Sequence, residues 1–193
     1  DDAKIINGYV KVSKGADLSE AVITLDQTQF TYSGTEHKPT VIVTVGGKTL
    51  TEGKDYTLTF ANNVNAGIAT VTVRGISQAA GGIAGGGEDI GNSSNSGDIT
   101  ESIYTGKIIK NFTIKPATVD IIWEGDEFYY TGNPHKVTAK YVDVNGDENP
   151  AAITQNKTNT EIGKYIATAV VEDANYTVNG ATINHAYEIK WYD

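Results

Sequence analysis

Three histidines are the residues of this sequence best suited to move a proton or to bind a metal ion. His37 and His135 stand at the same position of two copies of one pattern, Phe30–Lys38 and Phe128–Lys136. A catalytic residue seldom recurs at matching positions of two scaffold copies, so we expect both histidines to have a structural or surface role. His185 has no such counterpart, and a single histidine makes neither a metal site nor a catalytic triad.

A short glycine-lysine-threonine run looks like the end of a phosphate-binding loop: Gly47-Lys48-Thr49. Such a loop needs a glycine where this chain has Ile42, and a helix after it. Here a strand pattern follows, and Gly46-Gly47 is a typical two-residue hairpin turn. No G-x-G-x-x-G pattern precedes an expected helix, so we expect no nucleotide cofactor.

Oxygen-bearing side chains alternate near Gly146 like the ligands of a calcium loop. They are Asp143, Asn145, Asp147 and Asn149. An EF-hand loop places its glycine sixth, whereas Gly146 comes fourth, so a turn is the favoured interpretation. Three further acids could hold calcium within a glycine-rich stretch: Glu88, Asp89 and Asp98. Closing so flexible a loop costs entropy, so disorder is favoured there, and we expect no cofactor apart from this weak indication of calcium.

Aromatic residues give the sequence its candidate ligand contact, because exposed rings can form a platform for sugars. The candidates are Trp123, Tyr129, Trp191 and Tyr192. Trp123 and Trp191 fall on the inward phase of their strands, so we expect both to pack in the core. Tyr129 is out of phase with its neighbours Phe128 and Tyr130, which makes it the best candidate for an exposed contact.

The remaining reactive side chains indicate no enzyme. No G-x-S-x-G nucleophile motif is present. Most acids fall in expected turns, so no carboxylate pair for glycoside hydrolysis stands out. Some surface modules crosslink a strand lysine to an asparagine or aspartate beside an acid, but alternation points the candidate, Lys140, outward. An intact mass lower by one ammonia or one water would indicate such a crosslink.

Composition excludes several kinds of partner. The chain has 193 residues and a formal net charge of −9, which repels nucleic-acid phosphates and anionic membranes. No apolar run approaches the roughly 20 residues of a membrane-spanning helix, so we expect no membrane insertion. The chain has no cysteine, which excludes disulfides and thiolate chemistry. It has no methionine, even at position 1, so we expect a fragment or a processed protein.

The pattern that contains the paired histidines, hereafter the repeated motif, reads F-x-Y-[ST]-G-x-x-H-K, and its second copy begins 98 residues after the first. Apolar residues alternate around it with a period of two, as in Val41, Val43 and Val45, and no helical period is sustained. Asn145-Gly146 is a second hairpin turn. We therefore predict an all-β protein of two tandem small antiparallel β domains, each a small sandwich or a curled sheet.

The repeat also predicts the domain organisation. Residues 1–20 are a lead-in segment or an extra strand. Residues 21–115, hereafter the first repeat, form a β module with a flexible Gly/Ser/Asn-rich insertion at 77–102, whose apolar content is too low for a core. Residues 116–193, hereafter the second repeat, form the second module after a joint at Lys115-Pro116.

Taken in the order in which they follow one another along the chain, the turn and core residues resemble tandem modules of bacterial cell-surface proteins. The second half looks like the MBG-type module of adhesins. In the first repeat the resemblance is carried by Tyr32-Ser33-Gly34, Val41 to Val45, Gly53 to Thr57, Asn63 to Val73, Tyr104-Thr105-Gly106 and Phe112-Thr113-Ile114. In the second it is carried by Tyr130-Thr131-Gly132, Gly163-Lys164-Tyr165 and Asn175-Tyr176-Thr177. The insertion departs from the family, which usually has a tight turn there.

The resemblance implies that each of the two domains is an Ig-like sandwich or a β-grasp-like variant. It also implies an extracellular protein, on a bacterial cell surface or secreted, that is built of neighbouring repeat modules. We expect a non-enzymatic spacer or adhesion segment, and the partners would be host or matrix glycans or proteins. The alternative is a carbohydrate- or glycoprotein-binding module that uses the insertion at 77–102 and the exposed Tyr129. No nucleic-acid partner is expected.

Overall fold

The computed structural model describes residues 16–76 and 104–192. Within them the protein is all-β and sandwich-like, so the predicted fold class is confirmed. The helical part of these residues is one 3-10 turn, η1 (Leu18–Glu20), capped by the Asp17 side chain. The predicted insertion at 77–102 lies outside the described residues, as do residues 1–15 of the predicted lead-in.

Residues 16–115 contribute the strands β1 (Ala16–Asp17), β2 (Val22–Leu25), β3 (Gln29–Thr31), β4 (Val41–Val45), β5 (Lys48–Thr49), β6 (Tyr56–Ala61), β7 (Gly67–Gly75), β8 (Tyr104–Thr105) and β9 (Lys107–Lys115). The second repeat contributes β10 (Ala117–Val119), β11 (Ile122–Glu124), β12 (Glu127–Tyr129), β13 (His135–Lys136), β14 (Thr138–Val142), β15 (Glu148–Pro150), β16 (Ala152–Gln155), β17 (Thr158–Asn159), β18 (Gly163–Val170), β19 (Tyr176–Val178) and β20 (Asn184–Lys190).

Contacts between residues divide the chain into two compact units. Of the described residues, one unit comprises 16–26, 39–60, 70–76 and 104–110, and the other comprises 27–38, 61–69 and 111–192. Every strand of the described residues pairs within its own repeat or the lead-in before it. The domain boundary at Lys115-Pro116 stays a prediction.

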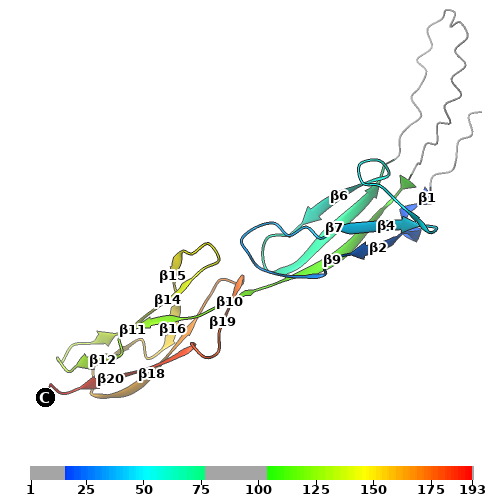
Figure 1. Cartoon of the computed structure of the whole chain (residues 1–193). Helices are drawn as coiled ribbons and strands as arrows, with labels where there is room; N and C mark the ends of the chain where they lie inside the picture. The colour runs from blue at the N-terminus through cyan, green and yellow to red at the C-terminus, as the bar shows by residue number, and fades with distance from the viewer. Residues whose placement is uncertain (1–15, 77–103, 193) are drawn as a thin grey trace, which may run out of the picture. The chain divides into compact units, whose positions relative to one another are not determined.

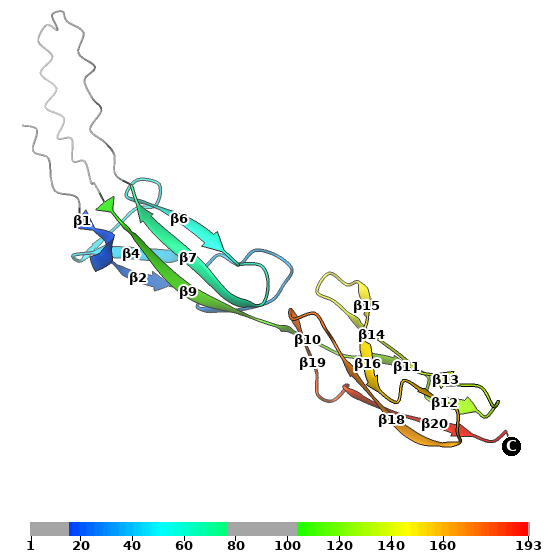
Figure 2. The same cartoon turned by 180° about the vertical axis from the view of Figure 1, so that it is seen from behind.

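Two sheets build the first repeat, in the orders β2-β4-β5 and β3-β9-β7-β6. Figures 1 and 2 both show β7 and β9 side by side as the two longest strands. The core lies between the sheets, where Ile23 and Val43 of one meet Val71 and Val73 of the other. The alternation that predicted these strands is confirmed, because Val41 and Val43 of β4 are buried, as are Ala69, Val71 and Val73 of β7. The predicted hairpin turn also forms: Gly46 and Gly47 have φ angles of 55° and 83°.

The second repeat has the main sheets β11-β14-β15 and β12-β20-β18-β16, with the short pairs β10-β19 and β13-β17. Strands β18 and β20 run beside each other in both views (Figures 1 and 2). One apolar cluster contains Ile121, Tyr141 and Ala169, and a second contains Val137 and Ile189. Trp123 packs against both clusters, so these two parts of the core are continuous.

Parallel strand pairs close both repeats, which the sequence did not predict. An early strand of each repeat pairs in parallel with its last strand, and we call these two pairs, β3–β9 and β12–β20, the terminal ladders. Flanking hydrogen bonds are matched as well. Tyr32 N donates to Lys115 O at 2.8 Å, and Tyr130 N donates to Lys190 O at 2.8 Å. The partners are far apart in sequence, so local alternation carries no signal of this pairing.

Two single elements of the fold relate directly to expectations from the sequence, the lead-in strand and Trp191. The lead-in contributes an extra strand, since β1 pairs in parallel with β8, and Leu18 after it is fully buried in the first core. The expectation that Trp191 packs in the core is wrong, because 64% of the residue is exposed. Strand β20 ends at Lys190, so the inward phase of the strand no longer directs the side chain that follows.

Candidate functional site

The repeated motif makes the same turn and the same ring contact in both copies. Gly34 and Gly132 have φ angles of 75° and 77°, a conformation that favours glycine. The ring centroid of His37 lies 4.8 Å from that of Phe30, and the ring of His135 lies 5.0 Å from that of Phe128. Both histidines therefore pack against the motif's own phenylalanine.

A hydroxyl group holds each of these imidazoles from the other side. Ser33 Oγ lies 3.2 Å from His37 Nε2, and Thr131 Oγ1 lies 3.3 Å from His135 Nε2. The serine-or-threonine position of the motif thus supplies the same contact in both repeats. This geometry is a structural use of the two histidines, in line with the role expected from their matching positions.

His185, the unmatched histidine, lies beside an indole ring. Its ring is stacked on Trp123 with centroids 5.1 Å apart and planes 13° apart. Its Nε2 is 3.3 Å from Asp126 Oδ1 and 3.3 Å from Gly125 O. Trp123 Nε1 donates to Thr182 O at 2.9 Å. The group links β20 to the turn before β12.

The candidate calcium ligands around Gly146 bind one another. Asp143 Oδ1 accepts from the backbone N of Asn145 at 2.8 Å and of Asp147 at 3.0 Å. Asp143 Oδ2 accepts from Asn149 Nδ2 at 3.2 Å. These bonds, led by the one from Asp147, lower the pKa of Asp143. The arrangement is that of a side chain closing its own turn, which agrees with the turn interpretation.

The described ranges 16–76 and 104–192 contain no group of three or more His, Cys, Asp or Glu residues that could hold a metal ion. The three acids of the insertion lie outside these ranges: Glu88, Asp89 and Asp98.

Lys140, the candidate for a crosslink, forms ion pairs across the outer face of its sheet. Its Nζ lies 3.1 Å from Glu148 Oε2 and 3.3 Å from Glu124 Oε1. Hydrogen bonding to these two carboxylates, Glu148 first, raises the pKa of Lys140. The outward orientation expected from alternation is confirmed, and both groups that hold the ammonium are glutamates.

Tyr129, the candidate ligand contact, is 41% exposed, as its position in the strand predicts. Its ring centroid lies 4.6 Å from that of Tyr192, which is 81% exposed, and Lys190 Nζ lies 5.4 Å from the ring of Tyr129. The exposed Trp191 packs edge-on against Tyr130. We call these four aromatic residues, Tyr129, Tyr130, Trp191 and Tyr192, the aromatic end of the second repeat.

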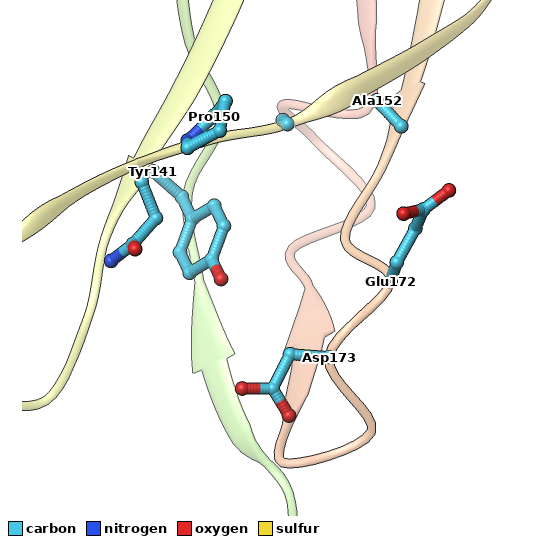
Figure 3. Close-up of a pocket in the computed structure, with 7 residues that line it drawn as sticks. Tyr141, Pro150, Ala152, Glu172 and Asp173 are labelled. Carbon is cyan, nitrogen blue, oxygen red and sulfur yellow. The ribbon is translucent and has the colours of Figure 1, made fainter.

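A cavity of about 350 Å³ opens elsewhere on the second repeat, and Figure 3 shows it from close by. We call it the acidic cavity. It is lined by Tyr141, Asn149, Pro150, Ala151, Ala152, Glu172 and Asp173. Strands β14, β15 and β16 supply one wall, and the segment that follows β18 supplies the two carboxylates opposite (Figure 3).

Tyr141 is the most deeply placed polar residue of the acidic cavity, since only 6% of it is exposed. Figure 3 shows its hydroxyl pointing into the cavity on the side of Asp173. Burial, followed by the charges of Asp173 and Asp143, raises the pKa of Tyr141, so the phenol stays protonated at neutral pH. Within the described part of the chain its hydroxyl has no hydrogen-bond partner, and it reaches the open space of the cavity.

Three residues of the acidic cavity, Tyr141, Glu172 and Asp173, are not among the candidates predicted from the sequence. Asp173 falls in an expected turn, and neither Tyr141 nor Glu172 belongs to a recognisable motif. The sequence contained one signal of this cavity. Three of its residues differ in polarity or charge from the residues 98 positions before them, in the first repeat. Tyr141 matches Val43, Glu172 matches Arg74, and Asp173 matches Gly75. A substitution that changes polarity or charge between two copies of a scaffold marks a position that the shared fold does not require.

No protein-family model matches this chain, and no curated protein matches it. The helical content of the described ranges includes no segment with the length and apolar character needed to cross a membrane.

Proposed function

We propose that this chain is a non-enzymatic segment of a bacterial cell-surface protein, where it acts as a spacer or an adhesion segment. The observation that carries this proposal is the pair of terminal ladders, in which each repeat joins an early strand to its last strand in parallel. Pulling on the two ends of a repeat shears such a ladder. Its hydrogen bonds then resist together instead of breaking one after another, which suits a segment under tension.

The flanking hydrogen bonds support the same role, because they extend both terminal ladders at matching places. Thr113 N donates to Thr28 O at 2.9 Å, and Glu188 N donates to Asp126 O at 3.1 Å. Thr28 and Asp126 are again 98 residues apart. The repeated motif is likewise used for a turn and a ring contact. The net charge of −9 favours solubility outside a cell.

Single-molecule stretching of the chain from its two ends tests this function. We expect discrete unfolding events at forces well above those of an unstructured chain. Glu188→Pro removes the N–H that bonds Asp126 O, so it should lower the force at which the second repeat unfolds.

Glu148→Pro is the matched control. Asp143 N donates to Asp147 O and Ala151 N donates to Ala139 O, so antiparallel alternation leaves the N–H of Glu148 outside the β14–β15 ladder. Pro150 already occupies an equivalent position of this edge strand. Extension without resistance would contradict the proposal. Robust hydrolytic turnover that one substitution abolishes in a folded variant would also contradict it.

A second candidate function is carbohydrate or glycoprotein binding, and the exposure of the aromatic end favours it. Tyr129 and Tyr192 present neighbouring rings to solvent, and Trp191 adds a third exposed ring. Rings with a free face stack on the apolar side of a sugar. Lys190 lies near Tyr129, and its ammonium pairs with Glu127 Oε1 at 2.8 Å.

A glycan array tests the second candidate. Binding that falls on Tyr129→Ala would support the aromatic end, and binding that falls on deletion of 77–102 would support the insertion. Tyr165→Ala is an unsuitable control because Tyr165 stacks on the buried Tyr187. Ile166→Ala, which removes an exposed apolar side chain from β18, is the better control and should leave binding unchanged. An array on which the wild-type chain binds no glycan would contradict this candidate.

A further inference from the structure

The polar side chains of the acidic cavity present mainly hydrogen-bond acceptors that have no partner in the described part of the chain. Glu172 has no ion pair or hydrogen bond through its carboxylate within the described ranges. Asp173 Oδ1 accepts from Asn175 N at 2.9 Å, which leaves Oδ2 open. Asn149 uses its amide hydrogens on Asp143 Oδ2 and Asp147 O, at 3.2 and 3.1 Å, so its remaining capacity is that of an acceptor.

The charges around the acidic cavity have one sign. Its seven lining residues include two carboxylates and no cation. Asp143 adds a third negative charge close enough to Tyr141 to act on its pKa. The neighbouring Lys140 belongs to the outer face of the same strand, where Glu124 and Glu148 hold its ammonium. A ligand that complements this cavity must bring positive charge and several donors.

We propose that the acidic cavity binds a guanidinium group. Guanidinium presents five N–H donors in one plane, which matches acceptors spread around a cavity, and carboxylates bind it through paired hydrogen bonds. Its weakly hydrated faces suit the apolar walls that Pro150 and Ala152 form (Figure 3). An ammonium is compact and strongly hydrated, so it gains less from those walls. The Tyr141 hydroxyl, which no described group engages, is placed to accept from the ligand.

Guanidinium can come from an arginine side chain of a partner polypeptide or from a small molecule. Glu172 and Asp173 are exposed, so the cavity is open to a side chain that projects from another surface. The first repeat provides no equivalent, because Val43 and Arg74 stand at the matching positions and would exclude or repel the same ligand. The inference is independent of the spacer function, since it concerns one repeat only.

The experiment titrates the full chain with the peptide acetyl-Gly-Gly-Arg-Gly-Gly-amide and follows amide NMR signals. We expect saturable shifts centred on Asn149 and Ala151. The same peptide with citrulline, the neutral isostere of arginine, should bind at least about tenfold more weakly, because charge-assisted hydrogen bonds are lost. The lysine peptide should also bind more weakly. Free arginine amide is the small-molecule probe. If it binds as tightly as the arginine peptide, the natural ligand is a small molecule, and if it binds more weakly, the natural ligand is a polypeptide. Both results support the guanidinium site.

Three variants connect binding to the cavity. Glu172→Gln and Asp173→Asn should each weaken binding about fivefold, and Asp173→Asn keeps the oxygen that accepts from Asn175 N. Tyr141→Phe keeps the ring and should weaken binding about threefold. Glu161→Gln removes one charge before the start of β18, at the end opposite Glu172, and should leave affinity unchanged. Circular dichroism checks that each variant is folded.

Several results would overturn the proposal. One is equal affinity for the arginine and citrulline peptides, and another is equal affinity for the arginine and lysine peptides. A third is an equal loss in Glu161→Gln and Glu172→Gln, which would indicate attraction to overall charge. Shifts that do not saturate, or that centre away from Asn149 and Ala151, would also contradict it.

Discussion

The two repeats agree where the chain turns and packs, and they differ at the end of their long central strands. Arg74 and Gly75 close β7 in the first repeat, while Glu172 and Asp173 follow β18 at the matching positions. The first pair borders a smaller cavity of about 240 Å³, which Lys107 also lines. The second pair borders the acidic cavity. One scaffold thus carries a basic hollow in one copy and an acidic hollow in the other.

The motif positions and the strand ends are subject to different constraints. A turn glycine or a ring contact must suit its own module, so it is the same in both copies. A strand-end residue that faces solvent, such as Arg74 or Glu172, can change sign without cost to the core. Gly75 is different, because it lies against the backbone of Tyr104 and an added side chain would meet that backbone.

The largest effect is expected at Gly75, the position where the second repeat has Asp173. A Cβ added to Gly75 would lie 2.4 Å from the carbonyl oxygen of Tyr104. Gly75→Ala should therefore lower the free energy of unfolding of the first repeat by about 3 kcal/mol. Urea unfolding followed by circular dichroism measures the loss.

Tryptophan fluorescence separates the two repeats in this measurement, because both tryptophans, Trp123 and Trp191, lie in the second repeat. The fluorescence transition of Gly75→Ala should stay at its wild-type urea concentration. Gly180→Ala is the control, since its Cβ would meet nothing within 4 Å. A wild-type midpoint for Gly75→Ala in circular dichroism would contradict the expected clash.

The next effect concerns the buried ring on the last strand, which is Phe112 in one repeat and Tyr187 in the other. The Tyr187 hydroxyl donates to Asn156 O at 2.8 Å and accepts from Asn159 Nδ2. Tyr187→Phe leaves these groups without a partner and should cost about 1.5 kcal/mol in the fluorescence-detected transition.

The reverse change tests the same contrast in the first repeat. Phe112→Tyr places a hydroxyl in surroundings that hold a phenyl ring and should cost about 2 kcal/mol by circular dichroism. If either exchange left stability unchanged, the two rings would be interchangeable and the contrast between the cores would fail.

A smaller effect, equal in both repeats, is expected at the paired histidines. His37→Ala and His135→Ala each remove a ring that packs on phenylalanine at about the same distance, 4.8 and 5.0 Å. Each variant should lose about 1 kcal/mol. Urea unfolding of the two variants, read by circular dichroism and by fluorescence, measures these losses. Unequal losses, or a binding activity that only one variant abolishes, would show that one histidine has a role of its own.

The smallest effect is expected in the pH dependence of stability and comes from the turn that Asp143 closes. In the first repeat the corresponding turn is Gly46-Gly47, which has no carboxylate. The pKa of Asp143 is below its ordinary value in the folded chain. Its stabilising contribution is therefore present above the ordinary pKa, near 3.8, and is lost as the pH falls through the lower folded value. Fluorescence-detected stability should decline between about pH 4 and pH 2, and less so in Asp143→Asn. An identical pH dependence in both proteins would contradict this assignment.

Local patterns in the sequence predicted much of this fold. Alternation in Val41–Val45 and in Ala69–Val73 identified buried faces, and the double glycine at 46–47 identified a turn. These features depend on neighbouring residues only. The terminal ladders depend on residues such as Phe30 and Ile114, whose pairing is set by the closed fold, so no local signal indicated them.

The candidate sites show the same division. Exposure of Tyr129 followed from its strand phase, whereas Trp191 lies just past the end of β20, where that phase no longer applies. Alternation predicted that Lys140 points outward, and the neighbouring Tyr141 is buried, but a period of two cannot show that the Tyr141 hydroxyl reaches a cavity. The approach of Glu172 to that cavity depends on the path of the chain after β18.

The terminal ladders also govern when each module can form during synthesis. Glu127 pairs with Glu188, so the ladder of the second repeat has no partner strand until nearly the whole module has been made. Contacts this remote in sequence slow folding, since a long loop must close before they stabilise the chain. The pairings β11–β14, β14–β15 and β16–β18 do not need β20, so they can form first, and the terminal ladder of the second repeat closes last, after β20 emerges.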